Sequence, residues 1–185
     1  MPIAGRFGRG VLLASPLDDW VRSTLPRAVG YARALARDPD EADDIVQDCY
    51  SRIIEHAGRY DLPHDGLKIL LRSITNACID RTNRKYLVSP SKNDGEDFSA
   101  GIADPKSPDP TKEAIAREMS GLIDASLAKL PATQRAAIYL TSLGYTLPEV
   151  AEMIGTTHGN ARVLVHRARK SLETDLSRFL IGDET

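Results

Sequence analysis

The chain has 185 residues, of which 42% are hydrophobic, 27% charged and 5% aromatic, and its formal net charge is -2. This length suits one mid-sized domain or two small ones. No run approaches about 18 apolar residues, so no membrane insertion is expected. The slightly acidic total argues against nucleic-acid binding by the chain as a whole, but charges segregated along the sequence can still create a local basic surface.

The beginning of the chain, residues 1–16, combines two arginines with an apolar run that is too short for the core of a signal peptide. We expect a flexible extension there, and a cytoplasmic protein. Cys49 and Cys78 have apolar neighbours in expected helices, which predicts buried thiols rather than a disulfide or a metal pair. No cofactor or metal is expected, because a zinc site with His56 lacks suitable ligand spacing.

Helices dominate the expected secondary structure. Apolar residues recur three and four positions apart, and alternating β-branched runs are nearly absent, so the fold class is predicted to be all-α. The first half contains three expected helices, over residues 17–37, 40–58 and 67–86, with a loop, GRYDLPHDG, before the third. The residues predicted to face inward on the second helix are Ala42, Ile45, Val46, Cys49, Ile53, Ile54 and Ala57, and those on the third are Leu70, Ile74, Ala77 and Cys78.

A change of composition divides the chain. Residues 88–110 are rich in Ser, Pro, Gly and Asp and have little to bury, which predicts a flexible linker. A coil of about 25 residues has a root-mean-square span of about 25–30 Å. We therefore expect two small helical domains, residues 17–87 and 111–185, on a tether.

The second domain is expected to contain a helix-turn-helix. Two helices come first, over residues 111–130 and from Pro131 to Gly144. Thr146 is the expected N-cap of a short helix, with Glu149 placed for a capping box, and Gly155 ends that helix. A longer helix follows over residues 158–175, so a short glycine-bearing turn joins the two.

The last helix is basic, with no acidic residue from Thr156 to Leu172. Its inward stripe is expected to be Ala161, Val165, Ala168 and Leu172, and its outward residues include Asn160, Arg162, His166, Arg167, Arg169 and Lys170. A helix fits the major groove of DNA, where Asn160 and Arg162 are best placed for base edges and the later cations for phosphates. The alternative is a basic face that is merely solvated, which leaves the short helix and turn before it unexplained.

The outer face of the second helix is acidic. Asp43, Asp44, Gln47 and Asp48 point outward when its apolar stripe points inward. DNA would be repelled by this face, which fits a basic protein surface instead. Solvated acidic residues at a helix start are common and favour the helix dipole, and on this stretch alone that simpler explanation is the better one.

Three stretches resemble the extracytoplasmic-function sigma factors, small members of the bacterial sigma-70 family. ADDIVQDCYSRI is similar to their region two, usually close to A-E-D-L-V-Q-E-V-F, and LLRSITNACIDRTNRK is similar to the following helix, typically R-N-L-A-I-D-x-x-R-R. LAKLPATQRAAIYLTSLGYTLPEVAEMIGTTHGNARVLVHRARKSL resembles region four, with the L-P, Q-R, E-x-A-x-x-x-G and H-R-A-R-K landmarks in order. The resemblance spans residues 17–86 and 125–176.

The resemblance implies a bacterial, non-enzymatic protein that binds core RNA polymerase and directs promoter-specific transcription initiation. Asp44, Gln47 and Asp48 would contact the β′ clamp helices, and the β flap is a further implied contact of the polymerase. The residues matching the −10 promoter contacts are Asn76, Arg81, Asn83, Arg84 and Lys85, with Asp80 as a structural partner. The residues matching the −35 contacts are Asn160, Arg162, His166, Arg167, Arg169 and Lys170. An anti-sigma factor is also implied as a partner.

The sequence departs from the family pattern at several positions. Ile69 stands where a tryptophan is frequent, and Arg81–Thr82–Asn83 interrupts the basic run after Asp80. Leu164 replaces an arginine that is common in the recognition helix. We therefore expect a specificity for the upstream element that differs from the usual one.

Two other functions stay open from the residues. The chain could be a stand-alone helix-turn-helix regulator, which would bind an operator as a dimer without polymerase. It could also be a sigma mimic that sequesters an anti-sigma factor and never contacts a promoter. An enzyme is not expected, because no nucleophile, base and orienting group converge in the sequence and its four histidines are scattered.

Overall fold

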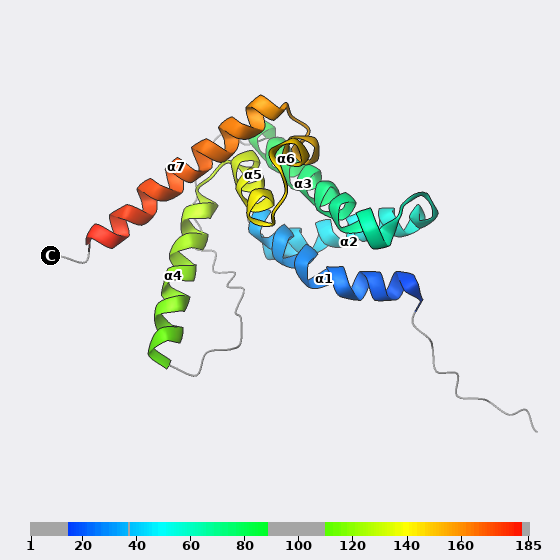
Figure 1. Cartoon of the computed structure of the whole chain (residues 1–185), viewed down its shortest axis with the longest axis horizontal. Coiled ribbons are helices and arrows are strands. Elements are labelled where there is room, and N and C mark those ends of the chain that lie inside the picture. Colours follow the sequence, from blue (N-terminus) through cyan, green and yellow to red (C-terminus); the bar gives the residue numbers. More distant parts are fainter. Residues whose placement is uncertain (1–14, 37, 89–109, 183–185) are drawn as a thin grey trace, which may run out of the picture.

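The computed structural model describes residues 15–36, 38–88 and 110–182, except for the side chains of 85–88, 110–116 and 178–182. The helices are α1 (Pro16–Leu35), α2 (Pro39–Glu55), a 3₁₀ turn (Ala57–Arg59), α3 (Leu62–Val88), α4 (Pro110–Ala128), α5 (Ala132–Ser142), α6 (Leu147–Ile154) and α7 (His158–Gly182) (Figure 1). The all-α prediction is confirmed. Among the described residues, none of the helices is both long and apolar enough to cross a membrane.

Helix α1 begins within the segment expected to be an extension. The Asp18 amide donates to Ser15 Oγ at 3.2 Å, and the Ser15 amide donates to Asp18 Oδ2 at 3.0 Å. This reciprocal pair is a capping box, and it fixes the start of the helix at Pro16. The rest of the predicted extension, residues 1–14, lies outside the described part of the chain, as does the predicted linker apart from its end residues.

Helices α1, α2 and α3 pack against one another around a shared core. The rings of Trp20 and Tyr50 meet edge to face with centroids 5.6 Å apart, and the Tyr50 hydroxyl lies 2.8 Å from Thr24 Oγ1. The Tyr31 hydroxyl lies 2.7 Å from Thr75 Oγ1. These buried polar groups are paired, so the aromatic rings fill the core without leaving a hydroxyl unsatisfied.

The inward faces of α2 and α3 are largely those predicted. Ile54 is the exception on α2, because 41% of it is exposed. Tyr50 is buried instead, four residues after Val46, because Thr24 on α1 accepts or donates the hydrogen bond that its hydroxyl needs. Both cysteines are buried, as predicted, and burial raises the pKa of Cys49 to about 11 and that of Cys78 to about 12. Both thiols are therefore protonated near neutral pH.

The predicted loop before the third helix is too long, since α3 already begins at Leu62. The His64 amide donates to Asp61 Oδ1 at 3.3 Å, which supports the first turn. Gly66 lies inside the helix because Trp20 approaches it closely: a Cβ at this position would lie 2.6 Å from Trp20 Nε1. The glycine is thus a packing requirement rather than a helix end.

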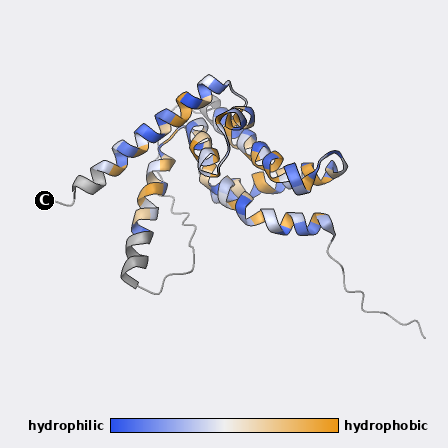
Figure 2. Cartoon of the chain, in the orientation of Figure 1, coloured by the Kyte–Doolittle hydropathy of each residue, from blue (hydrophilic) through white to orange (hydrophobic). Residues whose placement is uncertain are grey.

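Helices α6 and α7 form the predicted helix-turn-helix, and α5 packs against both of them. The Thr146 amide donates to Glu149 Oε2 at 3.0 Å at the start of α6, and Gly155 ends α6 in the left-handed region with φ of 74°. Helix α7 then contacts α4, α5 and α6, and its distal part extends away from the core together with α4 (Figure 1). Its described length is mostly hydrophilic (Figure 2).

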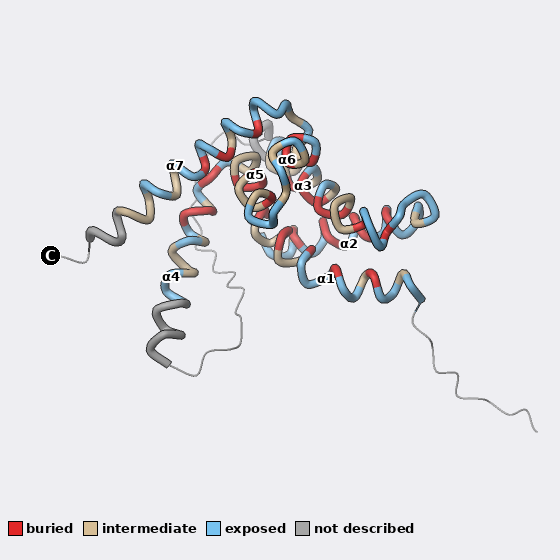
Figure 3. Tube along the Cα trace, viewed as in Figure 1, coloured by how far each residue is buried: buried red, intermediate tan, exposed pale blue. Residues whose placement is uncertain are grey.

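The two halves of the chain are in contact. Helix α3 contacts α5 and α6, α1 contacts α5, and one hydrophobic cluster runs through both halves. Figure 3 shows the buried residues concentrated where these helices meet. The sequence did not predict this contact, and it places the short helix α6 directly against α3.

Candidate nucleic-acid and protein interfaces

The outer face of α7 is accessible along its first four turns. All six of the predicted DNA-contacting side chains on it are exposed, namely Asn160, Arg162, His166, Arg167, Arg169 and Lys170. Ala161, Val165 and Ala168 are buried, which fixes the rotation of the helix as predicted. Leu164, which replaces the common arginine, is partly buried and packs against the core.

Threonines at the start of α7 hold the first of these side chains in place. The Asn160 amide nitrogen Nδ2 donates to Thr156 Oγ1 at 2.7 Å, and the backbone N–H of Asn160 donates to Thr157 Oγ1 at 3.2 Å. The side chain of Asn160 keeps its carbonyl oxygen and a second N–H for another partner. It is therefore pre-oriented at the end of the helix that would enter a groove.

Val163 was missed by the sequence reasoning. It is an aliphatic side chain with 40% of its surface exposed, among polar residues of the same helix face. Its spacing three residues after Asn160 is the signal that could have revealed it, since such positions share a helix face. An exposed aliphatic group there can contact a thymine methyl group.

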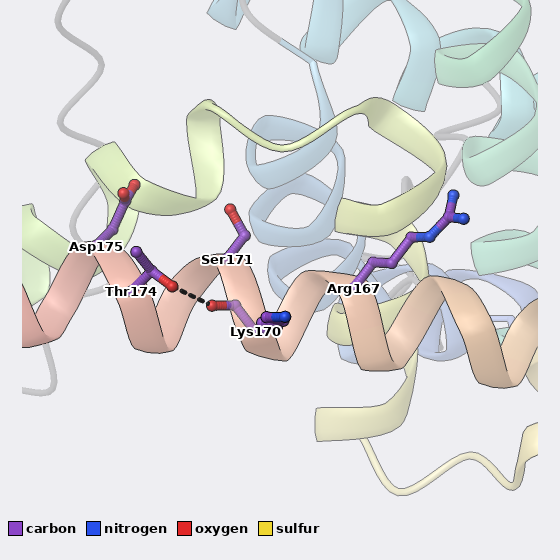
Figure 4. Close-up of a pocket in the computed structure, with 5 residues that line it drawn as sticks. All are labelled: Arg167, Lys170, Ser171, Thr174 and Asp175. Carbon is purple, nitrogen blue, oxygen red and sulfur yellow. Dashed lines mark hydrogen bonds between the residues drawn. The ribbon is translucent and has the colours of Figure 1, made fainter.

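A shallow hollow lies farther along α7, lined by Arg167, Lys170, Ser171, Thr174 and Asp175 (Figure 4). The Thr174 hydroxyl donates to the Lys170 carbonyl oxygen at 2.9 Å. Asp175 pairs with Lys129 at 3.1 Å, so the cationic end of the hollow is formed by Arg167 and Lys170. This arrangement suits a phosphate group passing along the helix better than an enclosed small molecule.

The acidic face of α2 divides into acids that serve the fold and acids that lie open. Asp38 Oδ1 accepts the Asp40 amide at 2.9 Å, and both carboxylate oxygens of Asp43 accept from Arg33, from Nη2 at 2.9 Å and from Nε at 3.2 Å. The three predicted polymerase-contacting residues, Asp44, Gln47 and Asp48, are exposed. The helix-start explanation therefore accounts for Asp38, but not for the three residues further along.

Two residues predicted for different partners are brought together. Arg81 on α3 lies 3.8 Å from Asp48 Oδ2 and 4.0 Å from Glu41 Oε1, with about a third of its side chain exposed. Its neighbours in the predicted −10 set, Asn76, Asn83 and Arg84, are exposed, while the side chain of Lys85 lies outside the described residues. Asp80 is also exposed.

A further pair of cations on α3 escaped the sequence reasoning. Lys68 Nζ lies 3.4 Å from Glu149 Oε1 and 3.5 Å from Glu152 Oε2, and Arg72 Nη1 lies 3.1 Å from Glu152 Oε1. Hydrogen bonds from Thr146, with a smaller effect of Lys68, hold the pKa of the Glu149 carboxyl below its usual value. Glu149 is therefore ionised throughout the neutral range while it faces Lys68.

The described residues contain no cluster of His, Cys, Asp and Glu that could hold a metal ion. The chemistry that these surfaces offer is charge and hydrogen bonding: carboxylates on α2, cations and amides on α3, and cations with one aliphatic side chain on α7.

Both halves of the chain match known protein families. Residues 20–86 match the family described as Sigma-70 region 2, and residues 120–172 match Sigma-70, region 4. The chain is 30% identical over 144 residues to the ECF RNA polymerase sigma factor SigM of Mycobacterium tuberculosis, covering 76% of this chain and 67% of SigM. It is 27% identical over 143 residues to SigW of Bacillus subtilis, covering 74% and 75% of the two chains.

A solved structure has the same fold. The sigma factor RpoE from Bartonella quintana, in complex with the anti-sigma factor NepR, aligns with a TM-score of 0.65 at 22% identity over 86% of this chain and 95% of RpoE. With both regions matched in order, the chain belongs to the ECF sigma factors of the sigma-70 family, DNA-binding proteins that direct transcription initiation and are not enzymes.

Proposed function

We propose that the exposed part of α2 is the surface that binds core RNA polymerase, with Asp44, Gln47 and Asp48 contacting the β′ clamp helices. An acidic helix face complements an arginine-bearing partner, and complementary charge guides association as well as specificity. The ion pair of Asp48 with Arg81 supports a preset orientation for this carboxylate. Arg81 would then serve the polymerase contact as well as the −10 contact.

The −10 element would be bound by α3, through Asn76, Asn83 and Arg84 together with Arg81 and Lys85. Amide side chains suit unpaired bases because they offer donors and acceptors together, and arginines suit phosphates. The exposure of Asn76, Asn83 and Arg84 supports this assignment.

The −35 element would be bound by α7 in the major groove. Asn160 and Arg162 lie near the helix start and would contact base edges, whereas His166, Arg167, Arg169 and Lys170 would line the phosphates. Four phosphate contacts alone give only weak binding that falls steeply with salt. Attachment to the same polymerase raises the effective concentration of each half at its element, and the β flap is the proposed polymerase contact of the C-terminal half.

The separation of charge carries this proposal. Exposed carboxylates gather on α2 and exposed cations on α7, at opposite halves of a chain whose net charge is only -2. RpoE is bound by the anti-sigma factor NepR in its solved complex, so we also propose an anti-sigma partner for this chain.

The test is co-purification with core RNA polymerase and run-off transcription. Asp44→Lys/Asp48→Lys should lose co-purification while keeping its helical circular dichroism spectrum. Glu118→Lys/Glu173→Lys makes the same charge change on α4 and α7 and should still co-purify. Wild-type binding by the first variant would refute the α2 assignment.

Run-off transcription also separates the two alternative functions. A stand-alone regulator would protect DNA from cleavage as a dimer without polymerase. A sigma mimic would bind an inhibitor protein but yield no transcript with purified core enzyme on any promoter of a library.

A further inference from the structure

Helix α3 carries a polar stripe that continues beyond the proposed −10 contacts. Lys68, Arg72 and Asn76 are four residues apart, and Asn83 follows seven residues after Asn76, so all four share one helix face. At 1.5 Å per residue, this stripe is about 22 Å long from Lys68 to Asn83. Two cations therefore extend the proposed DNA surface toward the start of the helix.

Both cations are occupied by carboxylates from the other half of the chain. Glu149 and Glu152 are three residues apart on α6, so they present both carboxylates on one face. Three ion pairs of 3.1–3.5 Å join them to Lys68 and Arg72. Although partial burial opposes it, the hydrogen bond and charge of these glutamates raise the pKa of Lys68. The lysine thus stays charged in this setting.

Buried contacts hold α5, which packs against α6, to the first half of the chain. Arg135 on α5 is only 4% exposed and donates from Nη1 to the carbonyl oxygens of Leu35 at 3.2 Å and Ala34 at 3.5 Å, at the end of α1. The Tyr31 and Tyr139 rings meet edge to face with centroids 6.3 Å apart. The carboxylates are therefore fixed against the cations by packing, not only by their own attraction.

We propose that Lys68 and Arg72 bind phosphates of promoter DNA, and that Glu149 and Glu152 of the same chain occupy these two sites until the halves separate. This proposal rests on the −10 role of α3 given above. A glutamate carboxylate offers the same charge-assisted hydrogen bonds to lysine and arginine that a phosphate oxygen does. In the closed chain, the acidic side of α6 stands where the DNA backbone would run.

The positions of the promoter elements require the halves to separate. The numbering of the −10 and −35 elements differs by about 25 positions, which corresponds to about 85 Å along B-form DNA at about 3.4 Å per base pair. In the closed chain α6 contacts α3 directly, and only the turn at Gly155 separates α6 from α7. The two DNA surfaces cannot span that distance in this arrangement, so engaging both elements removes Glu149 and Glu152 from α3.

The test uses the full chain and a fluorescein-labelled single-stranded DNA of about 12 nucleotides at low salt, read by fluorescence anisotropy. Glu149→Gln/Glu152→Gln should bind about threefold to tenfold tighter than wild type, because two phosphate sites become free while glutamine still suits the capping position of α6. Asp19→Asn/Glu55→Gln removes the same charge from exposed positions on α1 and α2. It should bind no more than about twofold tighter, which measures the effect of net charge alone.

The cations are tested in the same assay. Lys68→Gln/Arg72→Gln should change the binding of the otherwise wild-type chain by less than about twofold, because both cations are already paired there, and it should remove the gain of the α6 variant when the two sets of changes are combined. The proposal is overturned if the α6 variant is no tighter than its charge-matched control, or if the combined variant binds as tightly as the α6 variant.

Run-off transcription by the wild-type chain separates this proposal from the proposed function. If the wild-type chain yields transcripts but every variant binds the oligonucleotide as wild type does, the masking of Lys68 and Arg72 is rejected and the proposed function is kept. Absence of transcripts from every promoter would reject the assigned promoter role, whatever the oligonucleotide assay gives.

Discussion

Replacing Arg135 with methionine is the most direct test of the hydrogen-bonded contact between the two halves of the chain. The change keeps a long side chain of similar volume but removes every hydrogen-bond donor. The carbonyl oxygens of Leu35 and Leu130, which accept from Arg135 at 3.2 and 3.1 Å, would lose these bonds. Hydrogen bonds from a charged group contribute about 1.5–3 kcal/mol each, so we expect the free energy of unfolding to fall by about 3–5 kcal/mol.

Thermal unfolding followed by circular dichroism at 222 nm measures this effect. For a chain of this size, 1 kcal/mol corresponds to about 2–4 °C in Tm, so Arg135→Met should lower Tm by about 6–20 °C. Since Arg135 bridges the halves, the variant should also unfold over a broader range or in two steps. Arg59→Met, at an exposed position, is the matched control and should stay close to wild type.

A Tm for Arg135→Met within about 2 °C of the control would refute the reasoning. It would mean that the cost of taking the guanidinium group out of water cancels what its hydrogen bonds contribute, as happens in some buried ionic networks. The contact between the halves would then depend on apolar packing alone.

Two further predictions concern α7 and α3. If the exposed Val163 contacts a thymine methyl group, replacing that thymine of the −35 element with deoxyuridine should weaken holoenzyme binding about fourfold, since one buried methyl group contributes about 0.8 kcal/mol. The Val163→Ala holoenzyme should bind the two DNAs equally well. Equal sensitivity of both proteins at every thymine would contradict the contact. Gly66→Ala should lower the free energy of unfolding, measured by denaturant titration, by about 1–3 kcal/mol, because its Cβ would lie 2.6 Å from Trp20 Nε1. The control is Gly121→Ala on α4, where a Cβ meets nothing within 4 Å, and it should be neutral or stabilising. A stabilised Gly66→Ala variant would count against the contact with Trp20.

Periodicity predicted the features that depend on neighbours in sequence. The helices, the glycine-bearing turn after α6 and the rotation of α7 all follow from apolar residues three and four apart, with local signals such as Thr146, Glu149 and Gly155. The exposed positions of the predicted residues on α2 and α7 follow from the same periodicity, because they are the complement of the buried stripe.

The features that escaped depend on partners far along the chain. The sequence does not predict that Tyr50 is buried, because its hydroxyl depends on a hydrogen bond with Thr24 on another helix. It likewise places Gly66 in a loop, because the close approach of Trp20 cannot be inferred from neighbouring residues. The pairing of Arg72 with Glu152 spans 80 residues, so no local pattern encodes it. Contacts of this kind fix how the halves meet, and they become visible only in three dimensions.

The fit of Trp20 against Gly66 has a consequence for sequence variation. The indole ring of Trp20 occupies the space that a side chain at position 66 would need, so the two positions depend on each other. In a close-packed core, a larger side chain at one position requires a smaller one at the other. Among close relatives, we expect a large aromatic residue at position 20 to occur together with glycine at position 66, and a smaller residue at 20 to permit alanine or serine there.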